Sequence, residues 1–189
     1  MTLNELKNEV ASLGFESDID IDGLFITCAN RALRMIASAV PMTETLRVYE
    51  DDLPDGNIDS TDSVRLELKS RLDDFVKLIS QPTDADGNTI IGAEEDNGSL
   101  IIPRSCKLPL LIKYQRMPKR LTAEDRDRQI DVTRQTEHLL PLLTASFLWL
   151  DDDSEKSQYY MALYQSMING IRSAGRGASD LSYRTNGWA

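Results

Sequence analysis

Three scarcities limit what this chain can be. Its 189 residues contain one histidine, His138, and two cysteines, Cys28 and Cys106, which lack a C-x-x-C spacing. A multi-histidine metal site is therefore excluded, and two such cysteines in a cytosolic chain are expected to be free thiols. No apolar run approaches the roughly 18 residues that a membrane span needs, so we expect no membrane segment. The polar start MTLNELKNEV lacks a signal-peptide core, so we expect a protein made and kept in the cytosol.

Negative charge is in excess, and one segment carries all of it. The formal net charge is −10, and residues 44–103 contain 15 acidic and five basic side chains. The rest of the chain is balanced, with 16 side chains of each sign. Because neutralising DNA phosphates requires clustered lysine and arginine, we do not expect a general DNA-binding protein.

Apolar residues at helical spacing predict a helical hairpin at the start of the chain. Thr2 and Glu5 match a capping box, and the helix that follows is expected to end near Gly14. Asp22 is the expected N-cap of a longer helix, which Pro41 closes.

The second helical region begins near residue 131. The segment TEHLLPLLTASFLWL (136–150) is apolar on nearly every side, which predicts a helix at the centre of the core. Pro141 is expected to kink this helix or to lie in its first turns. Three aspartates follow Trp149 and predict a tight turn into an antiparallel helix, with Asp152 and Glu155 as its capping box.

Period-two alternation between the two helical regions predicts an antiparallel β unit. In VRLELK (64–69), apolar and charged residues alternate, which is typical of a strand with one solvated face. Turn dipeptides at Asp55-Gly56, Asp86-Gly87 and Asn97-Gly98 separate the candidate strands. The other predicted strands are 46–50, 75–79, 99–103 and 108–115.

The predicted fold class is therefore α+β. We expect a helical bundle of about four helices (1–43 and 117–172), with an inserted small antiparallel β unit (44–116) that is acidic. An extended C-terminal arm (173–189) completes the prediction, because AGRGASDLSYRTNGWA has three glycines and no helical stripe. The arm carries arginine and aromatic residues, which dominate contact energies at protein interfaces.

Two acidic segments resemble the start of an EF-hand calcium loop. In DIDIDGLFITCA (18–29) the first ligands and the glycine fit, but Ala29 stands where a bidentate glutamate is needed. In DADGNTIIGAEE (84–95), Glu95 stands at the twelfth position, but Thr89 replaces the glycine and no exiting helix is predicted. A helix-capping loop and a hairpin turn are the favoured interpretations, and a calcium-binding interaction module using 84–95 stays as the alternative.

No enzyme constellation is predicted, and we expect neither a cofactor nor a metal. His138 lies at the start of an apolar helix and has no nucleophile in a recognisable motif beside it. GRGAS (175–179) follows a helix and lacks the strand-then-helix context of a phosphate loop. Trp149 and the tyrosines at 159, 160 and 164 are interpreted as helix-packing residues.

The order of these segments resembles a known family. LNELKNEVASLGF…DGLFITCANRALRMI, followed by EHLLPLLTASFLWLDDDSEKSQYYMALYQSMI, is similar to the head–tail connector (neck adaptor) proteins of long-tailed bacteriophages. The similarity covers residues 3–40 and 136–172, and no motif of the family covers the β segment 44–116.

The resemblance implies a structural protein of the virion neck, between capsid and tail, made in the host cytoplasm. It implies a homo-oligomeric ring, typically a dodecamer, that stacks on the portal protein and contacts the adjacent neck or tail protein. DNA would pass through the ring's channel without specific binding, and an acidic channel wall would suit that passage. The residues carried over as portal-binding lie in the C-terminal region: Arg172, Arg176, Tyr183, Arg184 and Trp188.

Overall fold

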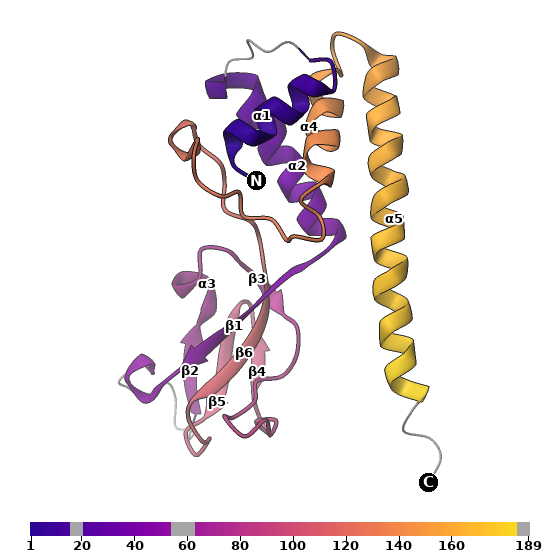
Figure 1. Ribbon diagram of the computed structural model, residues 1–189. Helices are drawn as coiled ribbons and strands as arrows, with labels where there is room; N and C mark the ends of the chain where they lie inside the picture. Colours follow the sequence, from indigo (N-terminus) through magenta and orange to yellow (C-terminus); the bar gives the residue numbers. More distant parts are fainter. Residues whose placement is uncertain (16–20, 54–62, 185–189) are drawn as a thin grey trace. The chain divides into compact units, whose positions relative to one another are not determined.

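The protein consists of two compact units, each with its own hydrophobic core (Figure 1). The computed structural model describes the backbone of residues 1–15, 21–53 and 63–184, and the side chains of these residues except 21, 22 and 175–184. Unit 1 comprises Met1–Val40 and Pro118–Ala189, and unit 2 comprises Pro41–Met117.

Unit 1 is built from α1 (Leu3–Ser12), α2 (Ile26–Ala39), α4 (Leu139–Leu148) and α5 (Ser154–Arg184). The predicted capping box of α1 is confirmed. The backbone N–H of Glu5 donates to the Thr2 hydroxyl at 3.2 Å, and the N–H of Thr2 donates to the Glu5 carboxylate at 2.7 Å. The predicted end of this helix is also confirmed, because Gly14 takes a positive φ of 92° just beyond it.

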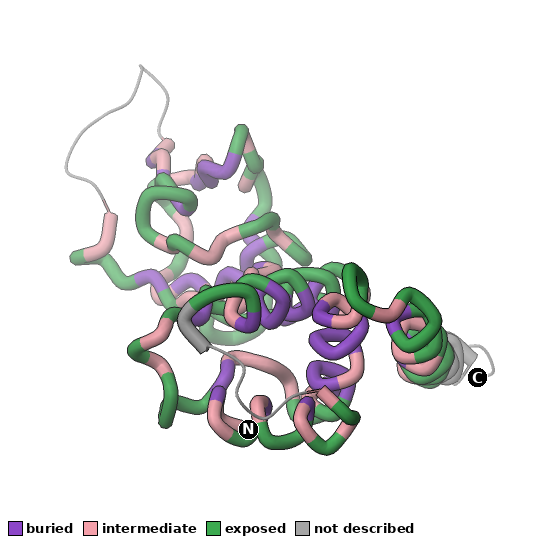
Figure 2. Tube along the Cα trace, turned by 90° about the horizontal axis from the view of Figure 1, so that it is seen from above, coloured by how far each residue is buried: buried purple, intermediate pink, exposed green. Residues whose placement is uncertain are grey.

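Helix α4 is the centre of unit 1, as its sequence predicts. Eight of its ten residues are buried, and it packs against α1, α2 and α5. Pro141 is the third residue of α4, where a backbone N–H has no partner within the helix, so the proline costs no helical hydrogen bond. In Figure 2, buried and exposed positions alternate along the other helices, which are amphipathic.

Two polar contacts fix the packing of unit 1. Asn30 of α2 contacts Leu121, in the segment between β6 and α4. Its side-chain amide donates to the Leu121 carbonyl at 2.9 Å and accepts from the Leu121 N–H at 2.8 Å. Between α4 and α5, the hydroxyls of Ser146 and Ser157 each donate to the other residue's carbonyl, at 2.9 and 2.8 Å. Small serines thus allow these two helices to approach closely.

The starts of two helices differ from the prediction. Phe25, not Asp22, occupies the N-cap of α2, because a π-helical turn (Ile21–Phe25) precedes the α-helix. The carboxylate of Asp153, not Asp152, accepts from the N–H groups of Glu155 and Lys156 at 3.1 and 3.0 Å. Three consecutive aspartates offer three possible caps in the sequence, and the geometry of the turn selects the last.

Unit 2 contains two three-stranded antiparallel sheets. The first has the order β1 (Met42–Val48), β6 (Leu110–Arg116), β3 (Phe75–Leu78), and the second has the order β2 (Ser63–Glu67), β5 (Ser99–Pro103), β4 (Glu94–Asp96). The short helix α3 (Leu68–Arg71) follows β2. In the β4–β5 hairpin, Asn97 and Gly98 have φ values of 52° and 88°, as the predicted Asn-Gly turn requires.

Both sheets contribute to one apolar core. In β2, Val64 and Leu66 are buried while Arg65 and Glu67 face outward, which confirms the predicted alternation. Partly buried residues, including Leu78 and Ala93, pack against this cluster. The buried members of the core are Val48, Val64, Leu66, Leu68, Ile90, Leu100, Ile102, Leu110 and Ile112.

The predicted fold, a bundle of about four helices with a small β insertion and an extended arm, is wrong. The β residues form two sheets around a core of their own, and β4 was not predicted. Helix α5 continues to Arg184, through residues expected to be extended. No proline follows Pro141, and glycine weakens a helix by about 1 kcal/mol per residue without breaking it. A helix that is already nucleated gains one hydrogen bond for each residue it adds, so it can include such glycines.

Candidate interaction surfaces

Helix α5 is far longer than the helix it packs against. Its 31 residues span about 46 Å at 1.5 Å per residue, whereas the ten residues of α4 span about 15 Å. Packing against α4 therefore accounts for only part of α5, and the helix needs other contacts or solvent along the rest.

The buried stripe of α5 ends at Ile171. Ser157, Tyr164 and Ile168 are buried, and Ile171 is partly buried against the core of unit 1. The next three residues, 172–174, are exposed. We call residues 172–184 the α5 extension, because the helix continues beyond Ile171, the last of its described side chains that packs against the core.

The structure places four of the five predicted portal-binding residues on the α5 extension. The Arg172 side chain is exposed, and Arg176, Tyr183 and Arg184 belong to the same helix by their backbone. At about 100° per residue, positions 172, 176 and 183 fall within about 40° of one another around the helix axis. Trp188 lies outside the described residues.

Arg172 also acts on a buried group of the core. Burial raises the pKa of the Tyr164 hydroxyl, and the nearby positive charge of Arg172 partly opposes that shift. The guanidinium therefore lies close enough to Tyr164 for its field to reach the edge of the core.

The aromatic residues interpreted as packing residues do pack in unit 1. The Trp149 ring lies edge-on to Phe15, with ring centroids 4.8 Å apart, and the Lys156 ammonium lies 3.9 Å from the Trp149 centroid. The Tyr160 hydroxyl donates to the Leu13 carbonyl at 2.5 Å. Tyr159 differs, because its side chain is exposed.

The segment 84–95 forms a turn and a strand rather than a calcium loop. The Asp84 carboxylate accepts from the N–H groups of Asp86 and Asn88 at 2.9 and 2.8 Å and from the Asn88 side chain at 3.0 Å. These bonds, led by the Asn88 side chain, hold the pKa of Asp84 below its usual range. Asp86 forms an ion pair with Lys107, and Glu95 lies in β4.

Other candidate site residues are also accounted for. Asp18 and Asp20 of the first acidic segment lie outside the described residues. His138 stands at the N-cap of α4, and its side chain makes no capping hydrogen bond. Within residues 1–15, 21–53 and 63–184, no group of three or more histidine, cysteine or acidic side chains is arranged to hold a metal ion.

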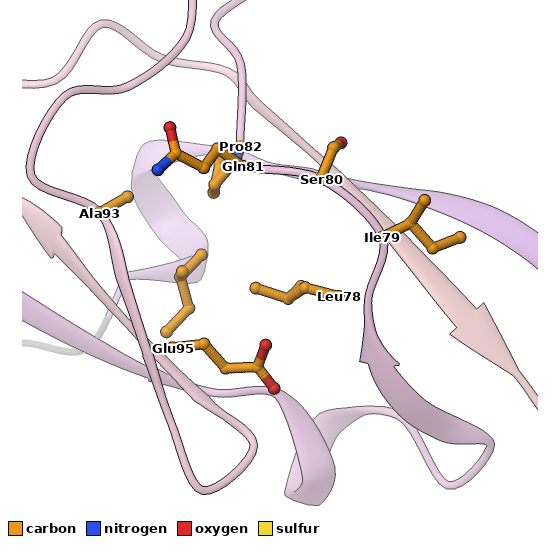
Figure 3. Close-up of a pocket in the computed structure, with 8 residues that line it drawn as sticks. Leu78, Ile79, Ser80, Gln81, Pro82, Ala93 and Glu95 are labelled. Atoms are coloured by element: carbon orange, nitrogen blue, oxygen red, sulfur yellow. The ribbon is translucent and has the colours of Figure 1, made fainter.

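One concave site in unit 2 was not predicted. An open groove of about 240 Å³ lies between the end of β3 with the residues after it and the segment that leads into β4 (Figure 3). In Figure 3, the side chains of Leu78 and Glu95 point toward each other across this groove. The groove is lined by Leu78, Ile79, Ser80, Gln81, Pro82, Ala93, Glu95 and Leu100.

Two adjacent isoleucines of unit 2 differ sharply in exposure. Two adjacent isoleucines stand in the otherwise polar stretch 84–98, and only one of them enters the core. Ile90 is 8% exposed and Ile91 is 90% exposed, at a turn where Gly92 has a φ of 82°. Single exposed apolar residues are common on protein surfaces, so Ile91 alone does not indicate an interaction surface.

Neither surface can be assigned from known proteins. In the described parts of the chain, no helix has both the length and the hydrophobicity to cross a bilayer. Comparison with models of known protein families gives no match, and no curated protein matches the chain.

Proposed function

We propose that this chain is a structural subunit of the head–tail connector of a tailed bacteriophage. In this proposal the subunit is not an enzyme. It joins a homo-oligomeric ring, typically a dodecamer, on the portal protein and offers a platform to the adjacent neck or tail protein. The ring surrounds a channel for DNA and belongs to the virion neck, after synthesis in the host cytoplasm.

The α5 extension is the observation that carries the proposal. Among the described side chains of α5, contact with the core of unit 1 ends at Ile171, and the exposed residues 172–174 begin a surface that other chains can contact. A subunit that acts by assembly needs such a surface, and the helical backbone continues from there to Arg184. Contact through a helix replaces the extended arm of the sequence-based prediction.

The order of elements in unit 1 also supports the proposal. A short capped helix and a longer one open the chain, and a buried apolar helix then turns through aspartates into a helix that carries tyrosines. This is the order on which the resemblance to connector proteins rests. The acidic excess of residues 44–103 suits a channel that DNA crosses without binding.

The calcium-module alternative receives no support from the described residues. The Asp84 carboxylate already accepts hydrogen bonds from donors of its own turn, and Glu95 lines the groove beside β4.

Deletion of residues 173–189 tests the proposal. The shortened protein should keep its thermal transition and lose only the helical circular dichroism of residues 173–184, because the last described side chain of α5 against the core is Ile171. It should no longer co-sediment with portal particles of the virus that encodes it. Full-length protein should co-sediment as a ring whose mass is a multiple of the 21.3 kDa subunit.

A pair of point variants provides the matched control. Arg172→Ala removes an exposed cation from the α5 extension, and Arg134→Ala removes an exposed cation elsewhere in unit 1. The first should reduce co-sedimentation and the second should leave it unchanged. Full retention of the shortened protein on portal particles would contradict the proposal.

A further inference from the structure

We propose that the groove between β3 and β4 receives an extended strand of another protein, one in which apolar side chains alternate with lysine or arginine. The inference concerns unit 2 alone. It goes beyond the connector proposal and does not depend on it.

The groove lies at an open edge of unit 2. Each sheet has two edge strands, and the groove lies beside one of each pair: β3 in the first sheet and β4 in the second, neither of which has a second neighbour among the described strands. The groove runs between residues that continue from β3 and residues that lead into β4. Leu78 and Leu100 line it and also belong to the apolar core or pack against it. An apolar side chain that enters here therefore meets the core itself.

The first wall of the groove offers unpaired backbone groups. On one side of it, the N–H of Ile79 donates to Lys113 at 3.0 Å. On the other, Thr83 and Leu111 exchange two bonds of 3.0 and 2.8 Å. Between them, the backbone groups of Ser80 and Gln81 make no hydrogen bond to any described residue. Both residues line the groove, so an incoming strand can satisfy these groups.

The second wall offers unpaired backbone groups as well. Asp96 and Ser99 flank the two-residue turn of the β4–β5 hairpin, so they form a hydrogen-bonded pair, and the pairs alternate from there. Glu95, opposite Leu100, is then a non-hydrogen-bonded pair, and its N–H and C=O point away from β5. Glu95 also lines the groove, so β4 presents its open edge on this side.

Charge decides which strand fits. The Glu95 carboxylate lies in the groove and makes no ion pair or hydrogen bond to any described residue. Two other carboxylates of this sheet are held, because Arg65 binds Glu67 at 2.8 Å and Asp96 at 2.9 Å. A cationic side chain on the incoming strand would supply the missing partner of Glu95.

The rim of the groove explains why the strand should also carry apolar residues. Ile79, which lines the groove, is 47% exposed. The side chains of a strand alternate between two faces, so the cations on one face can meet Glu95 while the apolar side chains on the other cover Ile79. Pairing of two copies through β4 is disfavoured, because it would set Glu94 and Glu95 against the same carboxylates.

The test uses the full chain and a fluorescent peptide, acetyl-KVKVKVKVK-amide, in 150 mM salt. Fluorescence anisotropy should show saturable binding. Two peptides of equal length serve as controls: EVEVEVEVE reverses the charge, and KSKSKSKSK keeps the charge but removes the apolar face. Neither control should saturate over the same range. Equal binding of KSKSKSKSK would overturn the proposal, because the attraction would then be charge alone on an acidic protein.

Two variants locate the binding. Glu95→Gln should weaken binding of KVKVKVKVK about tenfold, the loss typical of one charge-assisted hydrogen bond. Glu94→Gln is the matched control, since neighbouring strand residues point to opposite faces, and it should leave the affinity unchanged. Equal losses in the two variants would overturn the assignment of Glu95.

Amide exchange supplies an independent readout. Bound peptide should slow the exchange of the amides of Ser80, Gln81 and Glu95, because these groups become paired. Protection confined to unit 1 would overturn the proposal. Protection of the same three amides without peptide, together with a dimer mass, would identify a second copy as the occupant and overturn the assignment to a different protein.

Discussion

At the residue scale, the buried side chain of Asn30 links helix α2 to Leu121, in the segment that precedes α4. The residue is 5% exposed, and its amide satisfies both backbone groups of Leu121, which is 91 positions away in the chain. A buried backbone N–H or C=O without a partner costs free energy. The Asn30 amide therefore holds Leu121 against α2 and replaces water as the hydrogen-bond partner of its backbone.

Replacing Asn30 with alanine should therefore destabilise unit 1. Asn30→Ala leaves the N–H and C=O of Leu121 unpaired, and each group costs about 1–3 kcal/mol, so we expect a loss of about 2–6 kcal/mol in the free energy of unfolding. Urea unfolding followed by tryptophan fluorescence measures it. Asn8→Ala, at an exposed site on α1, should change the free energy by less than about 0.5 kcal/mol. A similar, small change in both variants would contradict the role assigned to Asn30.

Residue-level features of this kind are only half visible in the sequence. A single asparagine on the buried side of an apolar helix indicates that some polar partner exists. The partner, Leu121, depends on the path of the segment before α4, and no local sequence pattern predicts that path. The same holds for Ser146 and Ser157, whose reciprocal hydrogen bonds depend on how closely two helices approach.

At the level of elements, the turn around Asp84 is stabilised by a charged acceptor. Three donors from two residues surround its carboxylate, and its pKa lies below the usual 3.8 because the ionised form accepts these bonds. A carboxyl group whose pKa is lower in the folded protein adds stability above its unfolded pKa, and that stability is lost as the pH falls through the folded value.

Asp84→Asn should reveal this dependence. The amide keeps one acceptor oxygen but carries no charge, so the variant should be less stable than the parent protein at neutral pH. The difference should shrink as the pH falls below about 3.8, the usual pKa, and be smallest once the folded aspartate, whose pKa is lower, is protonated. Thermal unfolding between pH 3 and 7 measures it. A stability difference that is constant over this range would show that the charge contributes nothing.

Elements were predictable where their periodicity was strong. The alternation in 64–69 and the apolar segment 136–150 identify β2 and α4, because burial of one face or of the whole surface shows directly in composition. The strand β4 has only three residues, all acidic, and its pairing comes from the Asn97-Gly98 turn rather than from its own pattern. The open groove beside β4 was missed for the same reason.

The end of α5 was not predicted as helix, because its glycines and the lack of an apolar stripe indicated an extended segment. Small residues recur every four positions, at 162, 166, 170, 174, 178 and 182, which is a helical spacing without an apolar stripe. A stripe of leucines is the usual sign of a helix because most helices bury one face. The α5 extension starts where that burial stops, so the usual sign is absent there.

At the scale of the whole molecule, unit 2 is continuous in sequence and unit 1 is discontinuous. Unit 2 is one uninterrupted stretch, Pro41–Met117, and unit 1 is assembled from the segments on either side. Each unit has its own apolar cluster, and no residue of one cluster belongs to the other.

Residues 41–117 should therefore fold when expressed alone. The fragment contains all six strands and a complete core, and it should give a dispersed amide spectrum whose shifts match those of the same residues in the full chain. Ile112→Ala removes a buried side chain and should cost about 2–5 kcal/mol, enough to unfold a small fragment, whereas the neighbouring exposed Lys113→Ala should not. A collapsed spectrum for the unchanged fragment would contradict the independence of unit 2.

The pairing of β1 with β6 has a consequence for how such a chain can change over time. Met42 stands opposite Arg116 in the ladder, so the strand that enters unit 2 and the strand that leaves it meet at one end, about 5 Å apart. Val40 and Pro118 are consequently natural splice points. A gene segment encoding residues 41–117 can be gained, exchanged or lost by recombination as a cassette, and a short linker would restore the helical frame.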